Sequence, residues 1–90
     1  MSGASGPMPR IVRHYRLQWE PVQDCHVLLY PEGMVQLNRS AAEILRRCDG
    51  TRSVAAIVAE LEAAFATSGL AADVAQFLEH ARAQRWIESA

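Results

Sequence analysis

Hydrophobic and polar positions alternate with a period of two in the first half of the chain. From His14 to Glu20, three apolar side chains alternate with three polar ones, which is typical of a strand with one buried face. The next stretch, His26–Tyr30, is almost uniformly apolar and fits a central strand. In Met34–Leu37, Val35 and Leu37 share one face. Short turn sequences separate the three stretches, so the pattern predicts an antiparallel meander with the first and third strands at its edges.

The second half of the chain changes to a helical period. Apolar residues recur there every three or four positions, which predicts three helices: one from Ser40, one at about Ser53–Phe65 and one at about Ala71–Arg85. Their apolar stripes are Ala41, Ile44, Leu45 and Cys48; Val54, Ile57, Val58, Leu61 and Phe65; and Val74, Phe77, Leu78 and Ala81. Trp86 and Ile87 follow as a large apolar anchor. The expected fold class is α+β, a three-stranded antiparallel meander followed by three α-helices.

The junction between the two halves contains capping signals. Ser40 and Glu43 have the S-x-x-E spacing of a capping box. Gly50 follows Asp49 where a left-handed helix cap is expected, and Ser53 is positioned to cap the next helix.

Composition indicates a single folded module. The 90 residues are 50% hydrophobic and carry nine basic against ten acidic side chains, for a net charge of −1. A chain of this length fits one domain, which we assign to residues 10–90, preceded by a flexible Ser-Gly-Pro-rich tail at residues 1–9. The balanced charge argues against nucleic-acid binding. A winged-helix DNA-binding regulator is the alternative. Its DNA-recognition helix would be the third predicted helix, in which the acidic Asp73 and Glu79 offset the basic Arg82 and Arg85.

Catalysis has little support in the sequence. The chain contains no G-x-S-x-G, no H-E-x-x-H and no glycine-rich phosphate loop. Cys25 and His26 are adjacent, but neighbours on a strand point to opposite faces, so they would not form a nucleophile pair. Cys25 and Cys48 also lack metal-ligand spacing, which favours free thiols. We therefore expect a cytoplasmic, non-enzymatic protein with no metal, no cofactor and no membrane segment.

The third predicted strand suggests a binding function. Met34–Leu37 contains neither proline nor charge, the usual devices that discourage pairing at a sheet edge. An extended peptide can add to such an edge as a further strand. Two alternatives stay open at this point: the third helix covers the edge, or a second copy of the chain pairs with it. The same edge predicts a possible dimer at high concentration, formed by exchange of a strand or helix.

The chain resembles the PqqD family of the pyrroloquinoline quinone (PQQ) pathway. The resemblance runs from about Tyr15 to Ile87 and is carried by an ordered set of segments: Val-Leu-Leu-Tyr-Pro-Glu-Gly at 27–33, Leu-Asn-Arg-Ser-Ala-Ala-Glu-Ile-Leu at 37–45, Cys-Asp-Gly-Thr-Arg-Ser-Val at 48–54, and Ile-Val at 57–58.

The resemblance implies a winged-helix-like recognition domain for ribosomally made peptides. Members of the family are non-catalytic, bind the leader of the precursor peptide PqqA, and present it to the radical SAM enzyme PqqE, which cross-links a glutamate and a tyrosine. The leader would lie as an extra strand between the third strand and the third helix. Carried over to this chain, the peptide-binding residues are Met34, Val35, Gln36, Leu37, Asn38, Val74, Phe77, Leu78, Ala81, Arg82 and Arg85. Backbone pairing and apolar contacts would supply most of the affinity, and the two arginines would pair with acidic leader residues.

Overall fold

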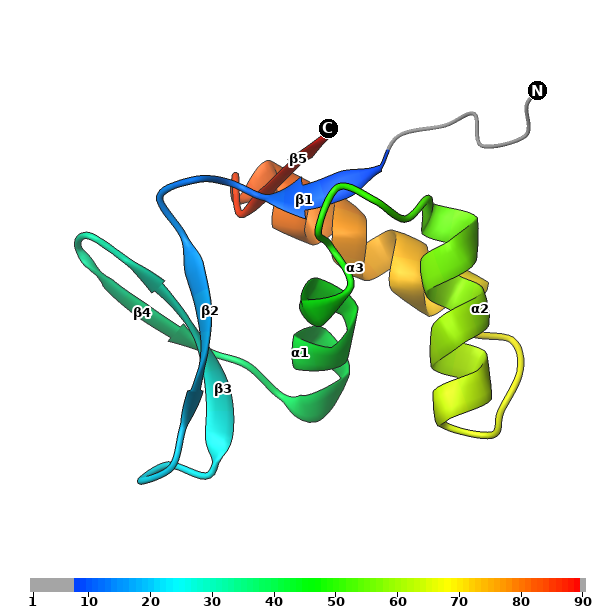
Figure 1. Ribbon diagram of the computed structural model, residues 1–90, viewed down its shortest axis with the longest axis horizontal. Helices are drawn as coiled ribbons and strands as arrows, with labels where there is room; N and C mark the ends of the chain where they lie inside the picture. Colours follow the sequence, from blue (N-terminus) through cyan, green and yellow to red (C-terminus); the bar gives the residue numbers. More distant parts are fainter. Residues whose placement is uncertain (1–7, 90) are drawn as a thin grey trace.

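The computed structural model describes residues 8–89, which form five strands and three helices (Figure 1). In chain order they are β1 (Pro9–Ile11), β2 (Arg16–Glu20), β3 (Cys25–Tyr30), β4 (Gly33–Gln36), α1 (Arg39–Arg46), α2 (Val54–Ala64), α3 (Ala71–Ala83) and β5 (Ile87–Ser89). This arrangement confirms the α+β class, the antiparallel meander and the three predicted helices. The finer winged-helix label stays a prediction.

Strands β2, β3 and β4 form one antiparallel sheet, with β3 in the centre. The register places Leu17 opposite Leu28 and Leu28 opposite Val35, so these three side chains share one face of the sheet. Helix α1 packs on β2 and β3, which covers this face. The period-two pattern therefore identified both the strands and their buried face.

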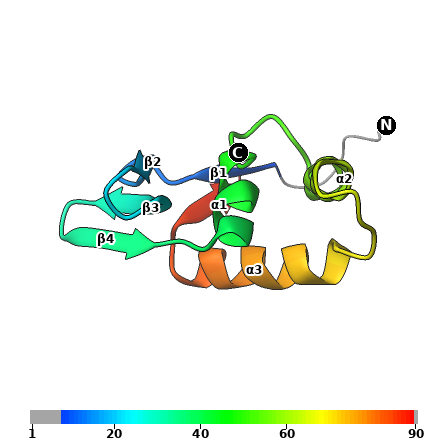
Figure 2. The same ribbon diagram turned by 90° about the horizontal axis from the view of Figure 1, so that it is seen from below.

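Helix α1 lies between the sheet and α2, while α3 runs along one side of the molecule (Figures 1 and 2). The whole predicted stripe of α1 is buried, and Leu45 is only 1% exposed. Ile57 and Leu61 of α2 and Val74 and Leu78 of α3 join the same apolar core. These contacts confirm the predicted core faces of the three helices.

A second, two-stranded sheet joins the two ends of the described chain. Strands β1 and β5 pair antiparallel, with Arg10 opposite Glu88, and the side chains of this pair form an ion pair of 2.9 Å. The backbone N–H of Val12 donates to the Trp86 carbonyl at 2.9 Å. Pro9, the last residue of the predicted tail, is buried within β1. Residues 1–7 of that tail lie outside the described residues.

The capping box predicted at Ser40 is wrong. Helix α1 begins at Arg39, and the side chain of Asn38 accepts a hydrogen bond of 2.8 Å from the backbone N–H of Ala41. Because the helix starts one residue before Ser40, that side chain lies within the first turn, and the capping position belongs to Asn38. The Glu43 carboxylate binds Arg46 and Arg47 instead of a backbone N–H.

Of the other two predictions at the junction, the Ser53 cap is confirmed and the Gly50 cap is confirmed only in its backbone conformation. Ser53 caps α2 as predicted, because its Oγ accepts a hydrogen bond of 3.2 Å from the Ala56 N–H. Gly50 has the predicted left-handed backbone, with φ of 82°. Its place is not the helix cap, however, since α1 ends at Arg46 and its C-cap residue is Arg47. The Gly50 N–H donates to the Pro9 carbonyl at 3.0 Å and ties the loop between α1 and α2 to β1.

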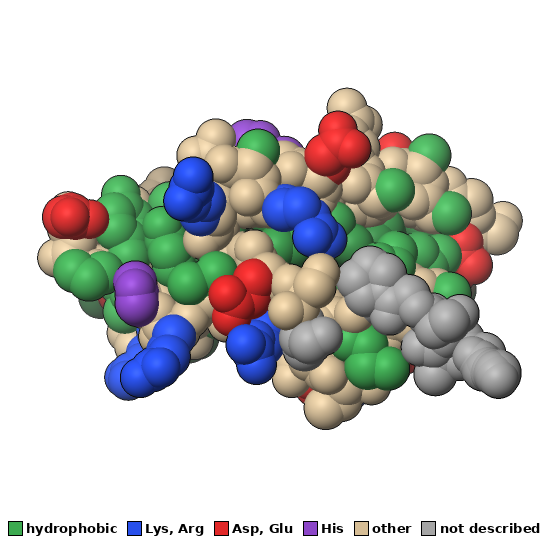
Figure 3. Space-filling view, turned by 90° about the horizontal axis from the view of Figure 1, so that it is seen from above, with side chains coloured by type: hydrophobic (Ala, Val, Ile, Leu, Met, Phe, Trp, Pro, Cys, Tyr) green, Lys and Arg blue, Asp and Glu red, His purple; other side chains and the backbone are tan. Residues whose placement is uncertain are grey.

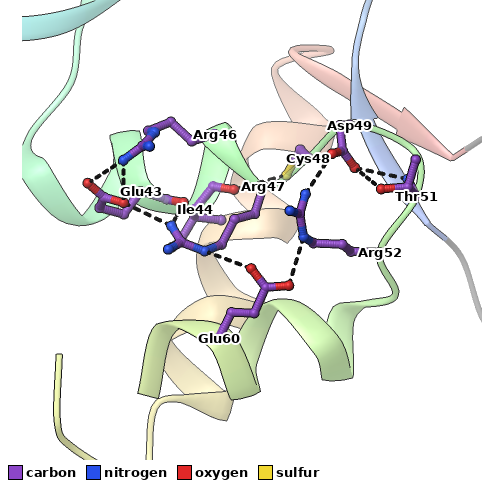
Figure 4. Close-up of polar contacts among 9 residues, drawn as sticks. All are labelled: Glu43, Ile44, Arg46, Arg47, Cys48, Asp49, Thr51, Arg52 and Glu60. Atoms are coloured by element: carbon purple, nitrogen blue, oxygen red, sulfur yellow. Dashed lines mark hydrogen bonds and ion pairs between the residues drawn. The ribbon is translucent and has the colours of Figure 1, made fainter. Parts of the chain in front are cut away.

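An ionic network links α1 to α2 (Figure 4). The Glu43 carboxylate lies 2.8 Å from the guanidinium of Arg47, which also approaches Glu60 at 3.3 Å. Arg52 completes the network, at 2.7 Å from Glu60 and 2.6 Å from Asp49. The Glu43 side chain is only 18% exposed. The hydrogen bond from Arg47 is the largest effect on its carboxyl group and lowers its pKa from the usual 4.5.

Replacing Asn38 with alanine tests the observed cap. Loss of the side-chain acceptor leaves the first turn of α1 with an unpaired N–H, so we expect about 1 kcal/mol less unfolding free energy. Ser40→Ala is the matched control and should change the stability by less than about 0.5 kcal/mol. Urea denaturation of the peptide-free protein measures both. A larger loss of unfolding free energy for Ser40→Ala than for Asn38→Ala would contradict the Asn38 cap and support the capping box.

Replacing Glu43 with glutamine tests the ionic network. Because the pKa of Glu43 is lower in the folded chain than in the unfolded one, its contribution to stability is complete above about pH 4.5 and disappears as the pH falls through the folded value. Glu43→Gln should therefore cost about 1 kcal/mol at pH 7 and less at pH 3, because a larger fraction of the carboxyl groups is protonated there. Denaturant midpoints at the two pH values give the comparison, with Glu79→Gln on the exposed face of α3 as control. An equal loss at both pH values would mean that the carboxylate charge does not stabilise the fold.

Candidate peptide-binding site

The outer edge of β4 carries main-chain groups that do not face β3. The N–H of Leu37 donates to the His26 carbonyl at 3.0 Å. Positions that bond across an antiparallel pair alternate along the strand, so Val35 also directs its main-chain groups toward β3, while Met34 and Gln36 direct theirs away. Among residues 8–89, no strand pairs with β4 on that outer side. Within the described residues, the edge predicted from the sequence is therefore open to a further strand.

The side chains of β4 divide between the two faces of the sheet. Leu37 is 6% exposed and belongs to the core, and Val35 is half-buried against it. Met34 is 46% exposed on the opposite face, beside Gln36. The Gln36 amide donates to the side-chain carbonyl of Gln23 in the turn before β3. A strand added to this edge would therefore contact one exposed apolar side chain, Met34, and one exposed polar side chain, Gln36.

The predicted helix residues of the site have two different locations. Val74, Leu78 and Ala81 lie in the core at 5% exposure or less, where a bound peptide would reach little of their surface. Phe77 is half-buried, and Arg82 and Arg85 are exposed. One helical stripe cannot tell core from groove, because both uses require apolar residues at the same spacing. The role of these residues in peptide binding stays a prediction, and Phe77 and the two arginines are the best placed for it.

Strand β4 and helix α3 lie along the same side of the molecule. Figure 2 shows β4 at the sheet end of this side and α3 continuing along it, with the C-terminal end of the helix nearer the sheet. The same end is nearer the sheet in Figure 1. The outer edge of β4 and the C-terminal end of α3 are therefore exposed on the same side of the molecule.

A hollow that the sequence analysis did not predict lies beside the C-terminal end of β4. It measures about 320 Å³ and is lined by Trp19, Asp24, Cys25, His26, Leu37, Asn38, Arg39, Ala42 and Glu43. The rings of Trp19 and His26 meet edge to face at 5.1 Å. Trp19 is 47% exposed, although the alternation places it on the buried face. Its high exposure shows that the cover over this face is incomplete at the β2–β3 turn, and an alternating pattern cannot indicate where such a cover stops.

Both cysteines are free thiols, as predicted. The Cys48 thiol is buried and donates to the Ile44 carbonyl at 3.3 Å. Burial raises its pKa to about 12, which keeps it protonated and unreactive. Within residues 8–89, no cluster of three or more His, Cys, Asp or Glu side chains is arranged to hold a metal ion. No helix in that range has the length and apolar character needed to cross a membrane.

Charge is mixed over the surface. On the face seen in Figure 3, acidic and basic side chains alternate with apolar ones, and no basic stripe is visible there. The exposed positions of α3 include Asp73, Gln76 and Glu79. Arg82 is also exposed on this helix, so its exposed charges are mixed, and it lacks the basic stripe that attracts a phosphate backbone.

A family model places this fold among known proteins. The model described as coenzyme PQQ synthesis protein D (PqqD) matches residues 25–87. This chain belongs to the PqqD family. The match spans β3 to the start of β5 and so includes the open β4 edge and all three helices.

Individual relatives support the assignment. The chain is 60% identical over 82 residues to a PqqA binding protein of Azotobacter vinelandii, covering 90% of this chain and 89% of the relative. A PqqA binding protein of Pseudomonas fluorescens Pf-5 is 54% identical over 91 residues and the full length of both chains.

A solved PqqD structure shares the fold. The solution NMR structure of the PqqD truncation of Methylobacterium extorquens PqqCD superimposes with a TM-score of 0.75 at 28% identity, covering 94% of this chain and 96% of that one. That protein is described as a functional, stand-alone recognition element for ribosomally synthesised and post-translationally modified peptides. The resemblance to PqqD read from the sequence is therefore confirmed.

Proposed function

We propose that this chain binds the precursor peptide PqqA by adding the peptide's leader as a strand to the outer edge of β4. The observation that carries the proposal is the outward direction of the main-chain groups of Met34 and Gln36 on an edge strand without charge or proline. The names of the relatives support PqqA as the ligand. In this mode the β4 backbone holds the leader, and residues on either side of the edge select its sequence.

The energetics favour a contact of moderate strength. Each main-chain hydrogen bond contributes about 0.5–1.5 kcal/mol net, and two outward residues offer two donors and two acceptors. The bonds together supply a few kcal/mol, part of which is lost in ordering the peptide. The remainder must come from side chains such as Met34 and the half-buried Phe77.

We also propose that the role is non-catalytic and that the bound peptide is presented to the radical SAM enzyme PqqE. A leader bound along one sheet edge leaves the rest of the peptide free to extend from the domain. The glutamate and tyrosine that PqqE cross-links would then enter the enzyme while the leader stays on β4. This division of work needs no reactive group on the recognition domain, which agrees with the inert thiol of Cys48.

Gln36→Pro tests the edge directly. Proline removes the outward N–H of Gln36 and leaves the bonds between β3 and β4 in place, so the domain should stay folded. We expect the affinity for synthetic PqqA to fall at least about tenfold, because one strand bond is lost and the ring hinders close approach. Gln36→Ala keeps the N–H and removes the same side chain, so it should weaken binding much less than the proline variant does. Titration calorimetry measures affinity, and circular dichroism checks the fold.

The results distinguish a wrong binding mode from a wrong ligand. Full affinity in a folded Gln36→Pro variant would rule out docking on β4 while leaving PqqA as the ligand. If that variant does not fold, Met34→Pro removes the other outward N–H and asks the same question. No binding of PqqA by the unchanged protein at high micromolar concentration would contradict the proposed function itself.

A further inference from the structure

The nine arginines differ in their partners: four form ion pairs with carboxylates within residues 8–89, and five form none there. Arg46, Arg47 and Arg52 belong to the ionic network between α1 and α2. Arg82 and Arg85, at the end of α3, form no ion pair with any carboxylate within residues 8–89. Two unneutralised guanidinium groups therefore lie close together in the chain at the end of the helix that faces the sheet.

These two arginines line one hollow. It measures about 530 Å³, lies between the β1–β2 connection and the C-terminal end of α3, and is formed by Val12, His14, Tyr15, Arg82, Arg85, Ile87 and Glu88. The single carboxylate in it, Glu88, is already paired with Arg10 at 2.9 Å. Arg82 donates to the Ser89 hydroxyl at 3.2 Å, a neutral partner that leaves its charge uncompensated. The wall of the hollow is thus basic and its apolar parts come from Val12 and Ile87.

The backbone at Arg85 adds a second observation. Arg85 has φ of 65°, in the left-handed region that favours glycine. It ends α3 in the usual way for such a position, since the following Trp86 N–H donates to the Ala81 carbonyl at 2.9 Å. A long cationic side chain stands here where glycine would fit the backbone better. Ala66, after α2, has the same kind of backbone, with φ of 51°, and lies outside this hollow.

The hollow is connected to the sheet through the side chain of Tyr15. Tyr15, which lines it, packs on Tyr30 with ring centroids 5.5 Å apart. Tyr30 is paired with Gly33, the first residue of β4. The hollow therefore lies toward the end of the sheet where β3 turns into β4, and a leader that extends beyond this end of the β4 edge would be placed to reach it.

We propose that this hollow binds an acidic side chain of the bound PqqA leader. The inference rests on the proposed function and adds the chemistry of one subsite to it. Guanidinium groups match carboxylate geometry and give paired, charge-assisted hydrogen bonds. The main-chain bonds of β4 carry no sequence information, so a carboxylate fixed at one end of the edge would set the register of the leader.

The test neutralises each side of the contact in turn. Synthetic PqqA is prepared with each Asp changed to Asn and each Glu to Gln, one at a time, and titrated against the unchanged protein and against Arg82→Gln and Arg85→Gly. Each arginine variant should bind unmodified PqqA about two- to fivefold more weakly. One neutralised peptide should lose a similar factor with the unchanged protein and lose nothing further with the variants, which identifies the paired carboxylate.

Arg85→Gly separates binding from stability. Glycine relieves the left-handed backbone, so the melting temperature should rise by a few degrees while PqqA affinity falls. Ala66→Gly makes the same backbone change elsewhere and should raise the melting temperature with unchanged affinity. A merely structural role for Arg85 would leave its variant as tight a binder as Ala66→Gly.

Three results would overturn the proposal. The first is unchanged affinity in both arginine variants while Gln36→Pro still abolishes binding, which leaves edge docking intact. The second is equal weakening of a neutralised peptide with and without the arginines. The third is loss of affinity on amidation of the peptide's C-terminus alone, which assigns the hollow to the terminal carboxylate. No binding by the unchanged protein would instead contradict the proposed function.

Discussion

The packing of α1 against the sheet determines how the rest of the molecule is arranged. Its stripe of small and branched residues, including Ala41, Ala42 and Leu45, is buried between β2 and β3 on one side and the other helices on the opposite side. Small residues allow the backbone of α1 to lie close to the sheet, and a well-packed core permits few alternative arrangements. Because β4 continues directly through Leu37 and Asn38 into α1, the position of this helix also fixes the direction of the open edge.

The β1–β5 pair supplies a second constraint. It joins the chain before the meander to the chain after α3, and the Gly50 N–H adds the α1–α2 loop to the same point. The end of α3 is thereby held beside the β1–β2 connection, which forms the hollow with Arg82 and Arg85. Two three-residue strands, each with one buried side chain, thus hold the end of a helix beside the β1–β2 connection.

The sequence predicted what depends on repeated patterns. Period two gave the meander and its edges, and period 3.6 gave three helices and their buried faces, because many residues contribute to each signal. Strands β1 and β5 were missed because three residues do not establish a period. Asn38 was passed over for Ser40, since both can cap a helix and their order depends on where the helix begins. In the site, the β4 edge followed from strand order, whereas the burial of Val74, Leu78 and Ala81 depends on tertiary packing.

An open edge of this kind raises the question of selectivity. Main-chain groups bind any extended peptide, so β4 alone would accept other strands, including a second copy of the chain. In the proposed binding mode, selectivity must therefore come from side chains beyond the two ends of the edge, where a bound leader would leave the ladder. One end lies toward the basic hollow of Arg82 and Arg85, through Tyr15 and Tyr30, and the other adjoins the hollow of Trp19 and His26. A short strand with different chemistry at each end can distinguish both the sequence and the direction of its guest, which a uniform sheet edge cannot do.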